Sequence, residues 1–134
     1  MQIEVLQEQG HVTTLKITGQ LDGQSYQDLI MKAQEVVGGG VKNIILDMGE
    51  LTYISSAGLV SLHAIAMLLN GESSPDPEQG WSALKSMDRG REGGLQKNIK
   101  LLNPRPEVVS VLDMVGFTTF FEIFTDKQKA IESF

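Results

Sequence analysis

Residues 52–62 read TYISSAGLVSL, and this stretch passes from strand-favouring residues to an apolar, helix-favouring run across two adjacent serines. Residues 57–69 are apolar nearly all round, which predicts a helix that other elements must cover on most sides. Serine is among the most favourable residues at a helix N-cap. The stretch therefore predicts a helix that begins beside Ser55 and Ser56, directly after a pair of β-favouring residues.

The part of the chain before this junction contains a hairpin pattern and one helical pattern. Residues 2–8 and 12–18 alternate between apolar and polar residues and predict two strands joined by a tight turn. Residues 19–23 are expected to form a loop, after which Ser25 is the expected N-cap of a helix. Residues 38–40 are all glycine and predict the end of that helix.

The remaining segments continue the alternation of strands and helices. They are a strand at 41–46, a loop at 47–52, a strand at 98–102, a helix after 103 ended by Gly116, a strand at 120–124 and a helix capped by Asp126. The resulting order, β-β-α-β-α-β-α-β-α, predicts a mixed β-sheet with α-helices in a single α/β domain over residues 1–134. That length is sufficient to bury a hydrophobic core.

Residues 71–94 interrupt this pattern. The segment contains five glycines and two prolines, which argues against a core element. It is predicted to be an inserted surface loop, with a short helix near residues 78–89. Trp81, the only tryptophan, leaves open a second role for the insert as a docking element for a partner or for a second copy of the chain.

The composition argues against several classes of function. The net charge of −6 disfavours binding to a phosphate backbone, so no direct nucleic-acid partner is expected. The chain has no cysteine, hence no disulfide framework or thiolate metal site, and no carboxylate cluster has metal-ligand spacing. The N-terminal MQIEVLQEQG is unlike a signal peptide, and no apolar run is long enough to span a bilayer. We expect a cytoplasmic protein with no membrane partner, no metal and no cofactor.

The residues alone leave three roles open for Ser56. It could cap the helix, or it could accept a phosphate, because the unpaired N–H groups and the positive end of the helix dipole favour negative charge there. A catalytic serine would need a base within hydrogen-bond reach. His63 would lie roughly 10 Å further along the same helix and His11 lies on the hairpin turn, so no catalytic residue is assigned. Gly58 removes a side chain from the first turn, which would let a partner approach closely.

Residues 47–59, which read DMGELTYISSAGL, resemble the signature of the STAS domain found in bacterial anti-sigma factor antagonists. Residues 19–22, GQLD, are similar to that family's loop after the second strand. Residues 106–117 and 120–124 are similar to its C-terminal helix and strand. The resemblance covers nearly all of the chain outside the insert, and the order and spacing of these pieces make it specific.

The resemblance implies a STAS fold and a function in partner switching. In this family, an anti-sigma factor that is also a serine kinase binds the unphosphorylated antagonist, which frees a sigma factor. The kinase phosphorylates one serine at the start of the helix, which breaks the complex, and a serine phosphatase reverses the modification. Carried over, the acceptor is Ser56, with Ser55 as the alternative because it replaces an aspartate common before the acceptor. The implied partner-binding residues are Asp22, Ser55, Ser56, Ala57, Gly58 and Leu59.

Two other functions stay open beside this one. The chain could be a STAS interaction or scaffold module that is never phosphorylated, in which case Ser56 would be only a cap. A serine hydrolase is the third alternative, although we expect the protein not to be an enzyme. The sequence also leaves open which anti-sigma factor is bound and whether the protein is a monomer or a homodimer.

Overall fold

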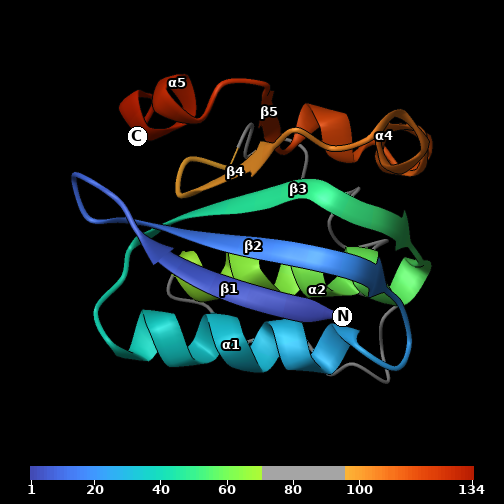
Figure 1. Ribbon diagram of the computed structural model, residues 1–134, viewed down its shortest axis with the longest axis horizontal. Helices are drawn as coiled ribbons and strands as arrows, with labels where there is room; N and C mark the ends of the chain where they lie inside the picture. Colours follow the sequence, from blue (N-terminus) through green and yellow to red (C-terminus); the bar gives the residue numbers. More distant parts are fainter. Residues whose placement is uncertain (71–95) are drawn as a thin grey trace.

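The computed structural model describes residues 1–70 and 96–134, which form a five-stranded sheet packed against helices (Figure 1). The strands are β1 Gln2–Gln7, β2 Val12–Leu21, β3 Asn43–Ile54, β4 Ile99–Leu102 and β5 Glu122–Phe124. They lie in the order β1-β2-β3-β4-β5. β1 and β2 pair antiparallel as the predicted hairpin, whereas every other neighbouring pair is parallel, so the predicted mixed sheet is confirmed.

Four α-helices and one short 3-10 helix accompany the strands within these residues. They are α1 Tyr26–Gly38, α2 Ser56–Leu69, α4 Pro106–Met114, α5 Lys127–Glu132 and the 3-10 helix η3 Phe117–Thr119. The helix ends follow the predicted signals: Asp126 Oδ1 accepts a hydrogen bond from the Lys129 N–H (3.1 Å), and Gly116 has a φ of 80° after α4. The predicted inserted loop at 71–94, with its short helix, lies outside the described residues.

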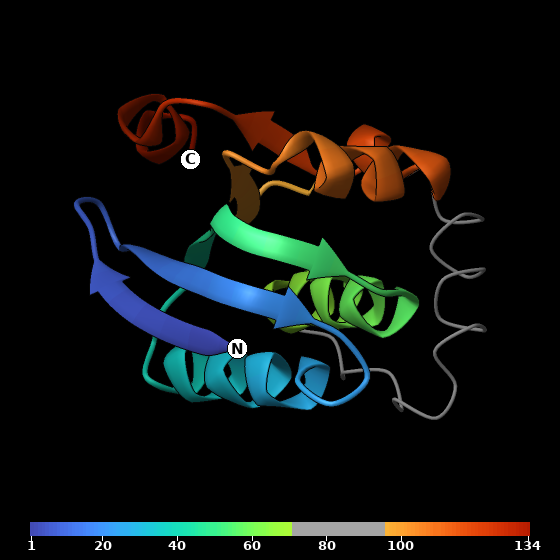
Figure 2. The ribbon, with the colours of Figure 1, turned by 45° about the vertical axis from the view of Figure 1, so that its right-hand side comes forward.

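The sheet separates two apolar layers of unequal size. On one face, α1, α2 and α4 pack against strand side chains such as Leu15, Ile44 and Leu101 in the main core. On the other face, Ala130 of α5 packs in a smaller cluster that includes Ile45. Ile44 and Ile45 belong to different layers because successive strand residues point to opposite faces. Figure 2 shows α1 and α2 side by side beneath β1, β2 and β3.

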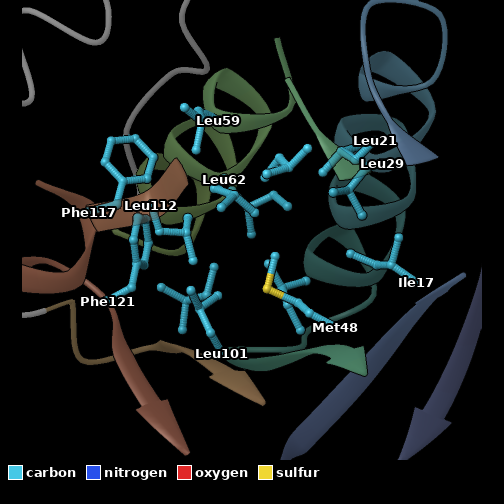
Figure 3. Close-up of a cluster of buried hydrophobic side chains, with 14 of the residues drawn as sticks. Ile17, Leu21, Leu29, Met48, Leu59, Leu62, Leu101, Leu112, Phe117 and Phe121 are labelled. Atoms are coloured by element: carbon cyan, nitrogen blue, oxygen red, sulfur yellow. The ribbon is translucent and has the colours of Figure 1, made fainter. Parts of the chain in front are cut away.

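α2 is covered on most sides, as its apolar composition predicts. Eight of its 14 residues are buried. Figure 3 shows Leu59 and Leu62 of α2 near Leu112 of α4 and near the Phe117 ring. The rings of Phe117 and Phe121 lie 5.3 Å apart between centroids and extend this cluster. Packing from α4 and η3 therefore holds the first turns of α2 in place.

The predicted loops at 19–23 and 47–52 are wrong for most of their length. β2 continues to Leu21 and β3 continues to Ile54, and the two strands pair in parallel up to these residues. Two register shifts along the way accommodate the irregular pattern that made both segments look like loops. The longer strands place the end of β2 directly beside the start of α2.

The last strand is shorter than the predicted 120–124. Phe120 and Phe121 are buried in the main core beside η3, so β5 begins only at Glu122. The first two residues of the predicted strand therefore pack in the core and are not part of β5.

Candidate functional site

The junction between β3 and α2 lies at the opposite end of the molecule from the β1–β2 turn (Figure 1). Ser55 is the N-cap of α2: its backbone is extended (φ −99°, ψ 177°), and its Oγ accepts a hydrogen bond from the Gly58 N–H (N···O 3.4 Å). Ser56 is the first residue of the helix. The capping role, which the sequence left open between the two serines, therefore falls to Ser55.

The Ser56 side chain is exposed at this helix start. Its hydroxyl makes no hydrogen bond to any other residue in the described parts of the chain. The first N–H groups of an α-helix have no partner within the helix, and the helix dipole is positive there. The first turn of α2 also contains no acidic residue. A negative group on Ser56 would therefore meet favourable backbone N–H groups and no carboxylate from its own turn.

Asp22 lies on the loop between β2 and α1, next to the start of α2. The Leu21 carbonyl, one residue earlier, accepts a hydrogen bond from the Ser55 N–H (2.9 Å). The Asp22 side chain is half-buried, and its Oδ1 accepts a hydrogen bond from the Gln24 N–H (3.0 Å). Asp22 and the two serines, which lie more than thirty residues apart in the sequence, thus belong to adjoining loops.

Gly58 and Leu59 are buried, and this changes the role expected for Gly58. A Cβ at Gly58 would lie 2.7 Å from Ile54 Cγ1 and 2.8 Å from the Leu21 carbonyl oxygen. The missing side chain therefore lets α2 approach β2 and β3 closely, and it does not open the surface to a partner as the sequence suggested. Among the predicted partner-binding residues, those with accessible side chains are Asp22, Ser55, Ser56 and Ala57.

Sequence reasoning assigned no role to Tyr53, whose side chain is 50% exposed two residues before the cap. The next residue, Ile54, is buried in the main core. Leu51 is buried in the same core, and the register shift between the Gly19–Leu51 and Gln20–Tyr53 pairs leaves Thr52 and Tyr53 exposed between the two buried residues. Tyrosine is enriched among the residues that dominate binding energy at protein interfaces. Tyr53 therefore offers an exposed aromatic side chain three residues before Ser56.

Neither histidine lies where it could activate Ser56. His11 is on the β1–β2 turn at the other end of the molecule (Figure 1), and His63 follows Ser56 on α2 at a distance of roughly 10 Å along the axis. Residues 1–70 and 96–134 contain no group of three His, Asp or Glu side chains that could hold a metal ion. Within the same residues, none of the helices combines the length and the apolar character needed to cross a bilayer.

The chain resembles a family of domains in its sequence and several solved structures in its fold. A family model described as "Mlab, STAS domain" matches residues 4–75. No curated protein matches the sequence significantly. A crystal structure of an anti-sigma factor antagonist from Mycobacterium paratuberculosis superposes with a TM-score of 0.66 at 13% identity, covering 98% of this chain and 93% of that chain.

Two structures of SpoIIAA also superpose on the chain. The unphosphorylated form, an anti-sigma factor antagonist, gives a TM-score of 0.56 at 15% identity and covers 98% of this chain and 96% of its own. The phosphorylated form from Bacillus gives 0.56 at 16% identity, with 98% and 97% covered. At these identities, the likeness is one of fold.

Proposed function

The chain belongs to the STAS domain family, and we propose that it is an anti-sigma factor antagonist switched by phosphorylation of Ser56. One observation carries the proposal: Ser55 caps α2, which leaves the Ser56 hydroxyl exposed and without a hydrogen bond to any described residue. The shared fold with an antagonist from Mycobacterium paratuberculosis supports the same role. SpoIIAA, which shares this fold, is known in an unphosphorylated and a phosphorylated form, and this supports phosphorylation as the switch.

In the proposed cycle, the unphosphorylated chain binds an anti-sigma factor with serine kinase activity in the cytoplasm. This binding releases the sigma factor that the anti-sigma factor held. The kinase then transfers a phosphate to Ser56, which ends the interaction, and a serine phosphatase removes the phosphate. Asp22, Ser55, Ser56 and Ala57 form the contact surface, while Gly58 and Leu59 hold the first turn of α2 in shape.

The switch acts through the charge of the surface and leaves the fold intact. A phosphoserine adds a charge of roughly −2, and the unpaired N–H groups at the start of a helix stabilise it. The phosphate therefore does not melt α2. Against a partner surface that also carries phosphate, such as a kinase with bound ATP, like charges in contact cost several kcal/mol. A loss of about 3 kcal/mol weakens binding more than a hundredfold.

The test is calorimetric titration of the anti-sigma factor with the wild-type chain and with Ser56→Ala and Ser56→Asp. Ser56→Ala should bind like the wild type. Ser56→Asp should bind at least tenfold more weakly, which is a smaller loss than for phosphoserine because a carboxylate carries less charge than a phosphate. Thr125→Asp, which places the same charge at an exposed position just before the start of α5, where the helix dipole also favours negative charge, is the matched control and should bind normally. Equal binding by Ser56→Asp and the wild type would overturn the switch.

A second candidate function is a STAS interaction module that works without phosphorylation. The matching family model is described by the STAS domain and Mlab, with no mention of sigma factors, and Ser55 stands where the resemblance places an aspartate. This candidate predicts that Ser56→Asp binds its partner as well as the wild type does. In neither case do we propose enzymatic activity, and a panel of ester substrates should show no turnover that depends on Ser56.

A further inference from the structure

The hydroxyl of Ser25 lies within hydrogen-bond distance of three groups in the loop that carries Asp22. Its Oγ accepts a hydrogen bond from the Asp22 N–H (3.1 Å), and it lies 2.9 Å from the Gln20 carbonyl oxygen and 3.2 Å from Asp22 Oδ1. A serine hydroxyl has one proton, so it donates to one of these two acceptors at a time. Ser25 is only 9% exposed, which limits the access of water that could replace these bonds.

This role differs from the helix cap that the sequence predicts for Ser25. Ser25 does occupy the N-cap position of α1, but its side chain makes no capping hydrogen bond to the helix. The hydroxyl is turned back to the loop, where it reaches residues three and five positions earlier. Capping of α1 therefore does not explain the hydroxyl.

The hydrogen bonds fix one oxygen of Asp22 and leave the other available. Oδ1 accepts from the Gln24 N–H and lies within hydrogen-bond distance of Ser25 Oγ. The Asp22 carbonyl oxygen accepts from the N–H groups of Ser25 and Tyr26, at 3.2 and 2.9 Å. Oδ2 makes no hydrogen bond to another described residue. The loop thus holds the carboxylate in one orientation.

The same loop is attached to the start of α2. Gln20 and Asp22, the two residues that Ser25 Oγ contacts, flank Leu21. The Leu21 carbonyl accepts from the Ser55 N–H and is also the backbone atom that Gly58 approaches. A change in the Ser25 bonds would therefore reach both Asp22 and Ser55.

We propose that Ser25 is a positioning residue for the partner-binding surface. Its hydroxyl orients the Asp22 carboxylate toward the partner and, through Leu21, steadies the capped start of α2 next to Ser56. The identity of the partner rests on the proposed function, but the local geometry does not. Ser25 itself is buried and does not touch the partner.

The local part is tested by amide hydrogen exchange, measured by NMR on the free full-length chain. In Ser25→Ala, the Asp22 and Ser55 amides should exchange about three- to tenfold faster, the amount expected from a lost hydrogen bond. The Lys129 amide, which donates to Asp126 Oδ1 at the exposed start of α5 and opens locally, should keep its wild-type rate. Ser25→Thr, which retains a hydroxyl, should keep all rates near wild type. Unchanged Asp22 and Ser55 amides, or an equal acceleration at Lys129, would overturn the proposal.

The functional part is tested by a double-mutant cycle with the anti-sigma factor used for the Ser56 variants. Ser25→Ala and Asp22→Asn should each weaken binding about tenfold, and the double variant should bind no more weakly than Asp22→Asn alone. Additive losses would show that Ser25 does not act through Asp22. Should the wild type itself not bind the anti-sigma factor, the proposed function fails, and the exchange rates alone decide whether Ser25 positions Asp22.

Discussion

The N–H of Ser55 donates a hydrogen bond to the carbonyl oxygen of Leu21, with an N···O distance of 2.9 Å. This bond joins the end of β2 to the residue that caps α2. It brings the loop of Asp22 and the exposed hydroxyl of Ser56 to one end of the molecule, although the sequence separates them widely. The candidate site therefore forms because the ends of β2 and β3 are held together.

Gly58→Ala should destabilise the protein because the new methyl group has no room. Its Cβ would lie 2.8 Å from a backbone oxygen, and backbone cannot move as easily as a side-chain end. We expect the free energy of unfolding, measured by urea denaturation, to fall by about 1–3 kcal/mol. Gly38→Ala at the end of α1, where a Cβ would meet no atom within 4 Å beyond its chain neighbours and its own helix backbone, is the control and should be neutral or slightly stabilising. Similar losses in both variants would contradict the close approach.

Ser55 and Ser56 should differ in their effect on stability. Ser55→Ala removes the cap of α2 and should lower the free energy of unfolding by about 1 kcal/mol, whereas Ser55→Asp should retain the cap. Ser56→Ala removes an exposed hydroxyl and should change stability by less than about 0.5 kcal/mol. Thermal or urea unfolding of the three variants measures this directly. A larger loss for Ser56→Ala than for Ser55→Ala would reverse the assignment of the cap.

Tyr53→Ala should weaken binding to the anti-sigma factor about tenfold without unfolding the protein. The side chain is half exposed three residues before Ser56, and aromatic residues often dominate interface energies. Met31→Ala on α1 is the matched control, since Met31 is a 64% exposed apolar residue that lies away from the β3–α2 junction. Calorimetry should show normal affinity for this control. Equal affinities for both variants would show that Tyr53 does not contact the partner.

Strong local patterns made most of the fold predictable. Neighbouring residues alone predict the alternating hairpin, the end of α1 at the triple glycine and the apolar helix α2. The continuation of β3 through residues 47–54 could not be read in this way, because DMGELT has no clean alternation. Pairing with β2, far away in the sequence, decides that segment.

The details of the site were less predictable than its place. Two adjacent serines are equally good caps by residue type, and the extended backbone of Ser55 and its hydrogen bond from the Gly58 N–H identify it as the cap. Gly58 suggested an open surface because nothing in the sequence places Leu21 against it. Likewise, the hydroxyl of Ser25 looked like a cap, while the hydrogen bonds it makes depend on the course of the preceding loop.

The phosphorylation state of Ser56 is the most direct test of the central claim. Protein purified from its native cells, under growth and under stress, can be measured by intact mass and then by fragment mass spectrometry. We predict a species heavier by one phosphate, with the phosphate on Ser56. Absence of any phosphorylated form under every condition, or a phosphate confined to Ser55, would contradict the proposed switch.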